Sequence, residues 1–133
     1  MSELSIELRL LAYAALICIL LWLPYVLARA QTWGLAATAG YPEDPPALPG
    51  WALRSIRAHA NWVENLAPFA ALVLLAHVGN ASNEMTALGA RLFFWGQLVR
   101  TVVHIAGVPW IRTGAFMVSW LGMVLIFLQV IGY

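Results

Sequence analysis

The chain of 133 residues has no lysine, one cysteine and few charged residues of either sign. Seven arginines and six acidic residues give a formal net charge of +1. So little basic charge provides no electrostatic field for a nucleic acid, and we exclude nucleic acid as a partner. Because Cys18 has no second cysteine to pair with, no disulfide forms within the chain, and cysteine usage leaves the redox compartment open.

What the chain has in excess is apolar residues. The sequence is 62% hydrophobic and 10% charged, far from the usage of soluble domains. A helix needs ~20 residues to cross ~30 Å of hydrocarbon. Segments of that length lie at about 5–28, 53–78, 86–106 and 111–131. Backbone groups in lipid must bond within their own segment, so we expect helices. Residues 1–133 are therefore predicted to form a single all-α domain, an integral membrane four-helix bundle with a proline-rich loop at 29–52.

The flanking charges bear on topology. Glu3 and Glu7 make the start of the chain acidic, and the first apolar segment is long for a signal sequence. We therefore expect a retained membrane span there. Most arginines at helix ends fall on one side of the predicted bundle, namely Arg29, Arg54, Arg57 and Arg112, whereas Arg9 and Arg91 fall on the other. The positive-inside rule predicts that the first side faces the cytoplasm.

Polar residues interrupt the second apolar segment. A carboxylate near the centre of a membrane helix costs roughly 2.5–3.5 kcal/mol on insertion scales, so it needs a partner, a watery pocket or a ligand. Spacings of four and three residues place Arg57, Asn61 and Glu64 on one helix face, with Pro68 one turn further. This stripe is the candidate functional site.

The third and fourth segments add to this stripe. Gln97, Arg100 and His104 share one face of the third helix, and Arg112 and Thr113 begin the fourth. The predicted pocket is mostly cationic and contains one carboxylate. Arginine forks bind carboxylates and a carboxylate binds ammonium, which favours a small anionic ligand that carries an amine. A thiol near Arg112 would have a lowered pKa, and the resulting thiolate is a nucleophile.

Simpler interpretations remain for several of these residues. Glu64 can pair with Arg57 or Arg100 and join two helices without any ligand. Arg29 and Arg54 are typical of snorkelling anchors at the membrane surface. His59 lies on a different face from Glu64 and is expected at the surface. No set of histidine, cysteine and acidic residues has the spacing of a metal site.

The polar motifs resemble those of a known family. They are Arg57-Ala-His-Ala-Asn61-Trp-Val-Glu64-Asn65 with Pro68-Phe69, Ala106-Gly-Val-Pro-Trp-Ile-Arg112-Thr113, and the loop element Pro42-Glu43-Asp44. In them the chain resembles the bacterial branch of the MAPEG family, membrane-associated proteins in eicosanoid and glutathione metabolism. The resemblance implies a homotrimer of four-helix protomers in a bacterial inner membrane. It also implies glutathione bound between neighbouring protomers near the cytosolic face.

The resemblance implies roles for individual residues. Positions that match glutathione ligands of the family are Arg57, Asn61, Glu64, Thr113 and, from an adjacent protomer, Arg29. Arg112 matches the arginine that stabilises the glutathione thiolate. The third helix departs from the family pattern, because Gln97, Arg100 and His104 stand where relatives have Arg, His or Tyr, and Tyr. Phe116 also replaces a tyrosine of some relatives. We include His104 among the expected ligands and Arg100 beside Arg112 as a catalytic cation.

The leading functional hypothesis is a glutathione-dependent membrane transferase or peroxidase that acts on lipophilic electrophiles. Its expected partners are glutathione, a lipophilic substrate, membrane lipids and two further copies of the chain. The alternative of the same fold is a non-catalytic protein that binds or presents lipid, which the altered third helix favours. A small transporter is a third possibility, but the sequence has no inverted repeat or matching broken helices.

Overall fold

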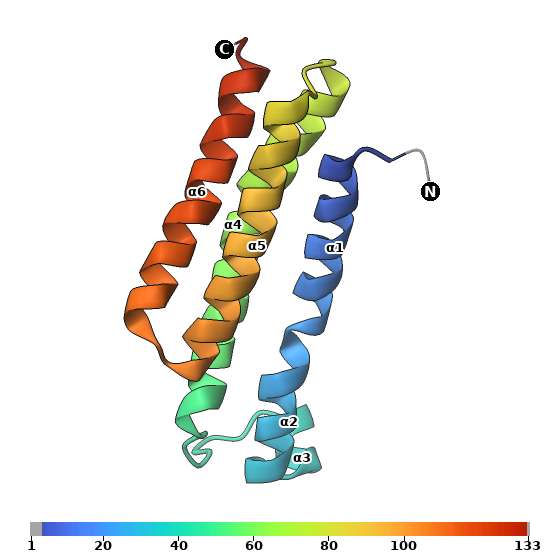
Figure 1. Ribbon diagram of the computed structural model, residues 1–133. Helices are drawn as coiled ribbons and strands as arrows, with labels where there is room; N and C mark the ends of the chain where they lie inside the picture. Colours follow the sequence, from blue (N-terminus) through green and yellow to red (C-terminus); the bar gives the residue numbers. More distant parts are fainter. Residues whose placement is uncertain (1–3, 133) are drawn as a thin grey trace.

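The computed structural model describes residues 4–132, and all regular structure in that part is helical (Figure 1). Its helices are α1 (Ile6–Leu20), α2 (Trp22–Trp33), α3 (Leu35–Ala39), α4 (Gly50–Val78), α5 (Glu84–Ala106) and α6 (Pro109–Val130). Glu3, one of the residues behind the expectation of a retained first span, lies outside the described residues. The predicted all-α membrane bundle is confirmed.

Helices α1 and α2 follow each other end to end and together make one long apolar stretch, Ile6–Trp33 (Figure 1). The Ser5 side chain caps α1 by accepting a hydrogen bond from the Leu8 N–H. Pro24 has no N–H and cannot bond the carbonyl group of Leu20, so regular helix is interrupted at Leu21. The first membrane crossing is therefore a kinked pair of helices.

Three stretches of the described chain are long and apolar enough to cross a membrane. They are Ile6–Trp33, Gly50–Val78 and Pro109–Val130. The 23 residues of α5 are also long enough to cross, and this helix contacts α1, α4 and α6. A helix surrounded by others in this way can carry more polar residues than a lipid-facing one. The chain is an integral membrane protein.

The segment expected as a loop at 29–52 is partly helical. Helix α2 continues to Trp33, where Gly34 with φ +86° interrupts the chain, and α3 follows at once. The alanine-rich sequence of α3 has high helix propensity, which accounts for this turn of helix. Apart from Gly34, the non-helical part of the 29–52 segment is residues 40–49, whose four prolines exclude regular helix. Helix α4 then starts at Gly50, earlier than the expected residue 53.

Helices α5 and α6 form a close antiparallel pair. A Cβ atom added to Gly122 would lie 2.4 Å from the Gly89 carbonyl oxygen, and one added to Gly96 would lie 2.8 Å from the Ser119 nitrogen. The absence of side chains at these glycines lets the two backbones touch. At the core, the Phe69 and Phe93 rings stack with centroids 3.9 Å apart and join α4 to α5.

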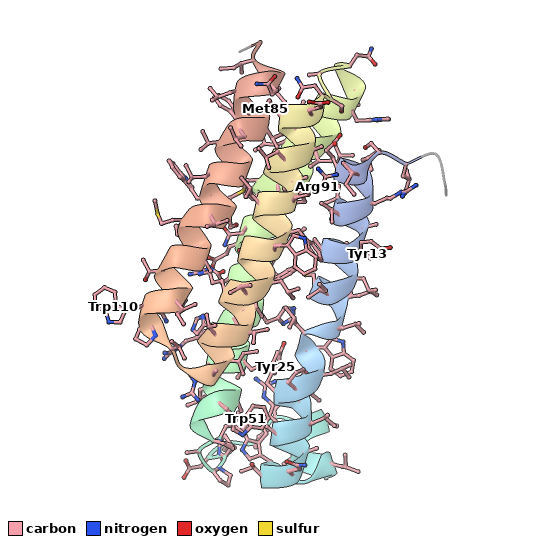
Figure 2. All side chains as sticks on the ribbon, in the orientation of Figure 1. Tyr13, Tyr25, Trp51, Met85, Arg91 and Trp110 are labelled. Carbon is pink, nitrogen blue, oxygen red and sulfur yellow. The ribbon has the colours of Figure 1, made fainter. Side chains whose placement is uncertain are left out.

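The bundle has two distinct ends. In Figure 1 the start of α1 and the end of α6 lie toward the upper end, whereas α3, the 40–49 segment and the α5–α6 turn lie at the lower end. Figure 2 places Trp51 and Trp110 near that lower end and Met85 near the upper one. The arginine-rich helix ends expected to share one side of the membrane therefore belong to the same end of the fold.

Candidate functional site

The polar face of α4 meets α5 through Asn61. The Asn61 Oδ1 atom accepts hydrogen bonds from Gln97 Nε2 at 3.0 Å and from Arg100 Nη1. Gln97 Nε2 and Arg100 Nη1 are both donors, so the Asn61 atom that faces them must be the amide oxygen. Its Nδ2 group is then the part of the side chain left to donate to a ligand.

Gln97 extends this contact to α6. It is fully buried, and its Oε1 atom lies 3.5 Å from the Ser119 hydroxyl, which donates to it. Its backbone carbonyl accepts a hydrogen bond from Thr101 Oγ1 at 2.9 Å. A polar chain thus runs from α4 through α5 to α6. Gln97 is therefore a hydrogen-bonded structural residue of this junction.

Arg100 is held between Asn61 and an aromatic ring. Its guanidinium carbon lies 4.9 Å from the centroid of the Phe116 ring on α6. The charge of Arg100 also interacts with those of Arg112 and Glu64. The Arg100 Nε atom is buried and has no hydrogen-bond partner among residues 4–132. Arg100 therefore keeps donor capacity at Nε, while its Nη1 group orients Asn61.

Glu64 and Arg57 lie on the outer surface of the single chain. Both side chains are exposed, although Glu64 is near the middle of α4. Glu64 forms no ion pair with any residue in 4–132, so the simpler expectation that it pairs with Arg57 or Arg100 within one chain is not realised. The charge of Arg100 acts on Glu64 without a direct contact, and a carboxylate with no ion pair at this depth favours a ligand or a second protein surface beside it.

Arg112 and His104 flank the turn between α5 and α6. Both are half-buried, and the charges of Arg112, Arg100, Arg57 and Arg54 all act on the His104 ring. Thr113 is exposed, and its hydroxyl donates to the Pro109 carbonyl at 3.3 Å, one turn back along α6. Four arginines are thus near enough to His104 to act on its charge, and whether they form a ligand pocket stays a prediction.

Arg29 lies apart from this cluster in the single chain. Its guanidinium carbon lies 5.1 Å from the Tyr25 ring centroid and 5.6 Å from that of Trp33, both on its own helix α2. Its Nε atom is buried and receives no hydrogen-bond partner from the described part of the chain. Whether it reaches a ligand in an adjacent protomer stays a prediction.

Two residues have structural contacts that the sequence did not indicate. His59 of α4, expected at the surface, is half-buried and packs against the kink between α1 and α2. Its Nε2 atom lies 3.0 Å from the Cys18 carbonyl oxygen and its Nδ1 atom 2.9 Å from the Tyr25 hydroxyl. A carbonyl only accepts, so Nε2 donates and Nδ1 accepts from Tyr25. Arg54, expected as a snorkelling anchor, donates from Nε to the Ile105 carbonyl oxygen at 2.9 Å.

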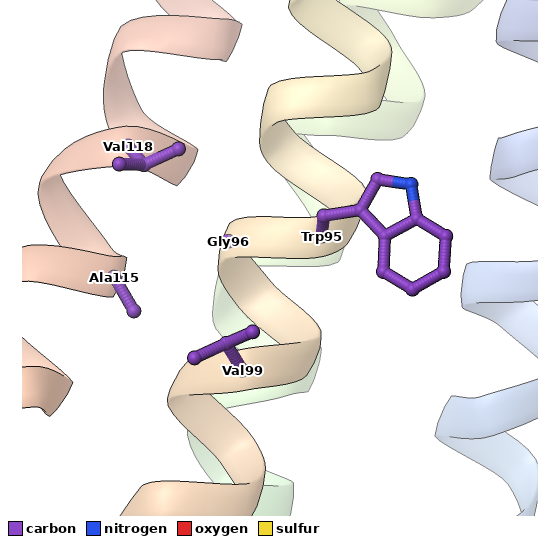
Figure 3. Close-up of a pocket in the computed structure, with 5 residues that line it drawn as sticks. All are labelled: Trp95, Gly96, Val99, Ala115 and Val118. Carbon is purple, nitrogen blue, oxygen red and sulfur yellow. The ribbon is translucent and has the colours of Figure 1, made fainter.

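Two apolar cavities lie beside α6. The first, of about 340 Å³, lies between α4 and α6 and is lined by Pro68, Leu72, Trp120, Met123, Val124 and Phe127. Pro68 is one turn beyond Glu64, so this groove continues the polar stripe into the apolar part of the bundle. The second, of about 230 Å³, is lined by Gly96, Val99, Ala115, Val118 and Trp95, whose ring points away from α6 (Figure 3).

The donor set fits glutathione by chemical type. Glu64 is an exposed carboxylate that could bind an ammonium group, and Arg57 is an exposed guanidinium that could bind a carboxylate. The Asn61 Nδ2 group can donate to a peptide carbonyl. No cluster of three or more metal-ligating side chains occurs in residues 4–132. The arrangement suits binding of a zwitterionic peptide.

Comparison with protein families gives one match. Residues 10–132 match the MAPEG family, a stretch that includes every predicted site residue. No match was found among curated proteins or among solved structures.

Proposed function

This chain belongs to the MAPEG family, and we propose that it is a glutathione-dependent transferase or peroxidase that acts on lipophilic electrophiles within the membrane. The observation that carries the proposal is the unpaired Glu64 carboxylate in the middle of α4, beside the oriented Asn61 amide and the exposed Arg57. A ligand with an ammonium group, carboxylates and peptide bonds would satisfy all three. Glutathione has these groups.

Arg112 is the proposed catalytic residue. A guanidinium beside the thiol of bound glutathione favours the thiolate by direct charge attraction. Arg100, whose charge interacts with that of Arg112, adds positive potential. His104 and Thr113 lie near Arg112 on either side of the α5–α6 turn and complete the proposed ligand set with Arg29 of an adjacent protomer.

Two reactions are compatible with this chemistry. In conjugation, the thiolate electron pair forms a C–S bond and the leaving group departs with the electrons of the bond that breaks. In peroxide reduction, the thiolate attacks one peroxide oxygen, the O–O bond breaks, and the alkoxide takes a proton to become an alcohol. A second glutathione then displaces water from the sulfenic acid and gives the disulfide. The apolar groove between α4 and α6 would hold the lipophilic part of either substrate.

A homotrimer with shared sites accounts for the exposed charges. On the single chain Arg57 and Glu64 would face lipid, which is unfavourable. A neighbouring protomer placed over this face would enclose the ligand, as the family resemblance implies. The concentration of arginines at the lower end of the bundle supports a cytoplasmic location of the site, in a bacterial inner membrane.

Calorimetric titration of the detergent-purified protein with glutathione tests the proposal. We expect saturable binding that Glu64→Gln weakens strongly and that Arg91→Gln, at the opposite end of α5, leaves unchanged. Turnover is then measured with 1-chloro-2,4-dinitrobenzene, which loses chloride on conjugation, and with cumene hydroperoxide. A folded wild-type protein that binds no glutathione would contradict the proposal.

A non-catalytic lipid-binding protein is the second candidate. Phe116, whose ring contacts Arg100, and His104 stand at positions where the resemblance implies hydroxyl groups in relatives. The missing hydroxyl groups favour the non-catalytic candidate. Glutathione binding without turnover of either test substrate would contradict the enzyme proposal and favour this second candidate. Equilibrium binding of a fluorescent fatty acid would then be the next measurement.

A further inference from the structure

The backbone of the α5–α6 turn leaves the Ile105 carbonyl group for a side chain to satisfy. Gly107, with φ +85°, adopts the left-handed conformation that ends α5. Its N–H donates to the His104 carbonyl at 3.1 Å, and the Val108 N–H donates to the Val103 carbonyl at 2.9 Å. This is the Schellman pattern, which satisfies two of the last four carbonyls of a helix. The Ile105 carbonyl receives the Arg54 Nε–H at 2.9 Å.

The Arg54 side chain occupies a narrow space between two glycines. A Cβ atom on Gly107 would lie 3.3 Å from Arg54 Cζ and Nε, and one on Gly50 would lie 3.2 Å from Arg54 Nη1. The guanidinium therefore joins the first turn of α4 to the end of α5. Its positive charge is also favourable beside the carbonyl end of a helix. Lysine has no planar group with an N–H at the Nε position, so it cannot reproduce this contact.

The turn that Arg54 holds connects two residues of the proposed site. His104 is in the last turn of α5, and Arg112 is in the first turn of α6, which starts at Pro109 only two residues after Gly107. Arg54 also lies one turn before Arg57 on the polar face of α4. Movement of the turn would therefore move Arg112 and His104 relative to the ligand groups of α4.

We infer that Arg54 is a positioning residue, which sets the place of Arg112 by capping α5 and without contacting glutathione. The catalytic part of this inference rests on the proposed function. A displacement of about 1 Å at a catalytic group can lower a rate by roughly 10²-fold. Arg54 should thus influence thiolate formation and turnover more than it influences binding of the peptide part of the ligand.

The test compares wild type with Arg54→Lys, Arg54→Gln and the control Arg91→Lys, all as purified full-length protein in detergent. The first readout is hydrogen exchange of the Gly107 and Val108 amides, which does not involve glutathione. The second is affinity for S-methylglutathione, which has no thiol to ionise. The third is the pH dependence of thiolate absorbance when glutathione is bound.

We expect both Arg54 variants to exchange these two amides at least about tenfold faster, because the cap is lost. Affinity for S-methylglutathione should stay within about twofold of wild type, while thiolate absorbance rises only at higher pH and kcat falls by about tenfold or more. Arg91→Lys should match wild type in every readout. If one Arg54 variant fails to fold, the other provides the same comparison.

Several outcomes would overturn the inference. Unchanged exchange of Gly107 and Val108 in both variants would show that Arg54 does not hold the turn. Faster exchange with unaltered thiolate formation would show that the turn does not position Arg112. A large loss of S-methylglutathione affinity would make Arg54 a direct ligand instead. If the wild type binds no glutathione, the proposed function fails, and amide exchange alone decides whether Arg54 holds the turn.

Discussion

Gln97 of α5 donates a hydrogen bond from Nε2 to the side-chain carbonyl of Asn61 on α4 at 3.0 Å. Gln97 is fully buried, and its own side-chain oxygen receives the Ser119 hydroxyl from α6. The pair links the three helices that carry most of the proposed site. It also orients the Asn61 amide so that its nitrogen is left to a ligand.

Replacement of Gln97 by leucine should loosen this junction. The Asn61 and Ser119 side chains would each lose a partner in a buried environment, which we expect to cost about 1–3 kcal/mol of stability. Glutathione affinity should fall as well, because Asn61 would no longer be held in one orientation. The measurements are unfolding in mixed detergent micelles and calorimetric titration. Gln31→Leu, at an exposed position of α2, is the control, and equal stability of the two variants would contradict the prediction.

Replacement of Arg112 by alanine should shift the pH dependence of turnover. In the proposed site the Arg112 charge lowers the thiol pKa of bound glutathione, so the thiolate is already present at neutral pH. Without this charge, the thiol pKa should rise toward about 8.5, and activity should be lost at neutral pH and partly recovered in alkaline buffer. Rates measured between pH 6 and pH 9 test this. A profile of unchanged shape would mean that Arg112 does not act on the thiol.

Replacement of Gly122 by alanine should separate α5 from α6. The added Cβ would lie 2.4 Å from the Gly89 carbonyl oxygen and 2.7 Å from the Phe93 nitrogen, both of which are backbone atoms that cannot easily move. We expect destabilisation of about 1–3 kcal/mol or more from overpacking. Gly114→Ala in the same helix meets nothing within 4 Å and should be neutral or stabilising. Similar unfolding curves for the two variants would contradict this account of the helix contact.

Replacement of Tyr25 by phenylalanine should weaken the kink between α1 and α2. The change removes the hydroxyl that donates to His59 Nδ1 at 2.9 Å, with an expected loss of about 0.5–1.5 kcal/mol. Tyr13→Phe, at an exposed position on the outer side of α1 (Figure 2), should have little effect. Thermal unfolding of both variants provides the comparison. A greater loss for Tyr13→Phe would show that the His59 contact contributes nothing.

The fold class could be predicted because a membrane limits the possibilities. Long apolar segments without internal hydrogen-bond partners must be helical in lipid. The predicted spans at 53–78 and 86–106 lie within α4 and α5, and the span at 111–131 exceeds α6 by one residue. The span at 5–28 starts one residue before α1 and crosses the break at Leu21. The segment at 29–52 was less well predicted. The alanines that follow Gly34 have high helix propensity and form the extra helix α3. Regular helix is excluded only at 40–49, by the prolines.

The sequence by itself determined that this is a helical membrane protein and that Arg57, Asn61 and Glu64 share one face of a helix. Such statements depend only on composition and on the 3.6-residue period of one helix. Which helix each polar group meets was decided by the tertiary structure. The contacts of Asn61 with Gln97, of Arg54 with Ile105 and of His59 with Tyr25 all join residues that are more than 30 positions apart. These contacts depend on the distance between the helices and on their register. For α5 and α6, the close packing at Gly89 and Gly122 sets both the distance and the register.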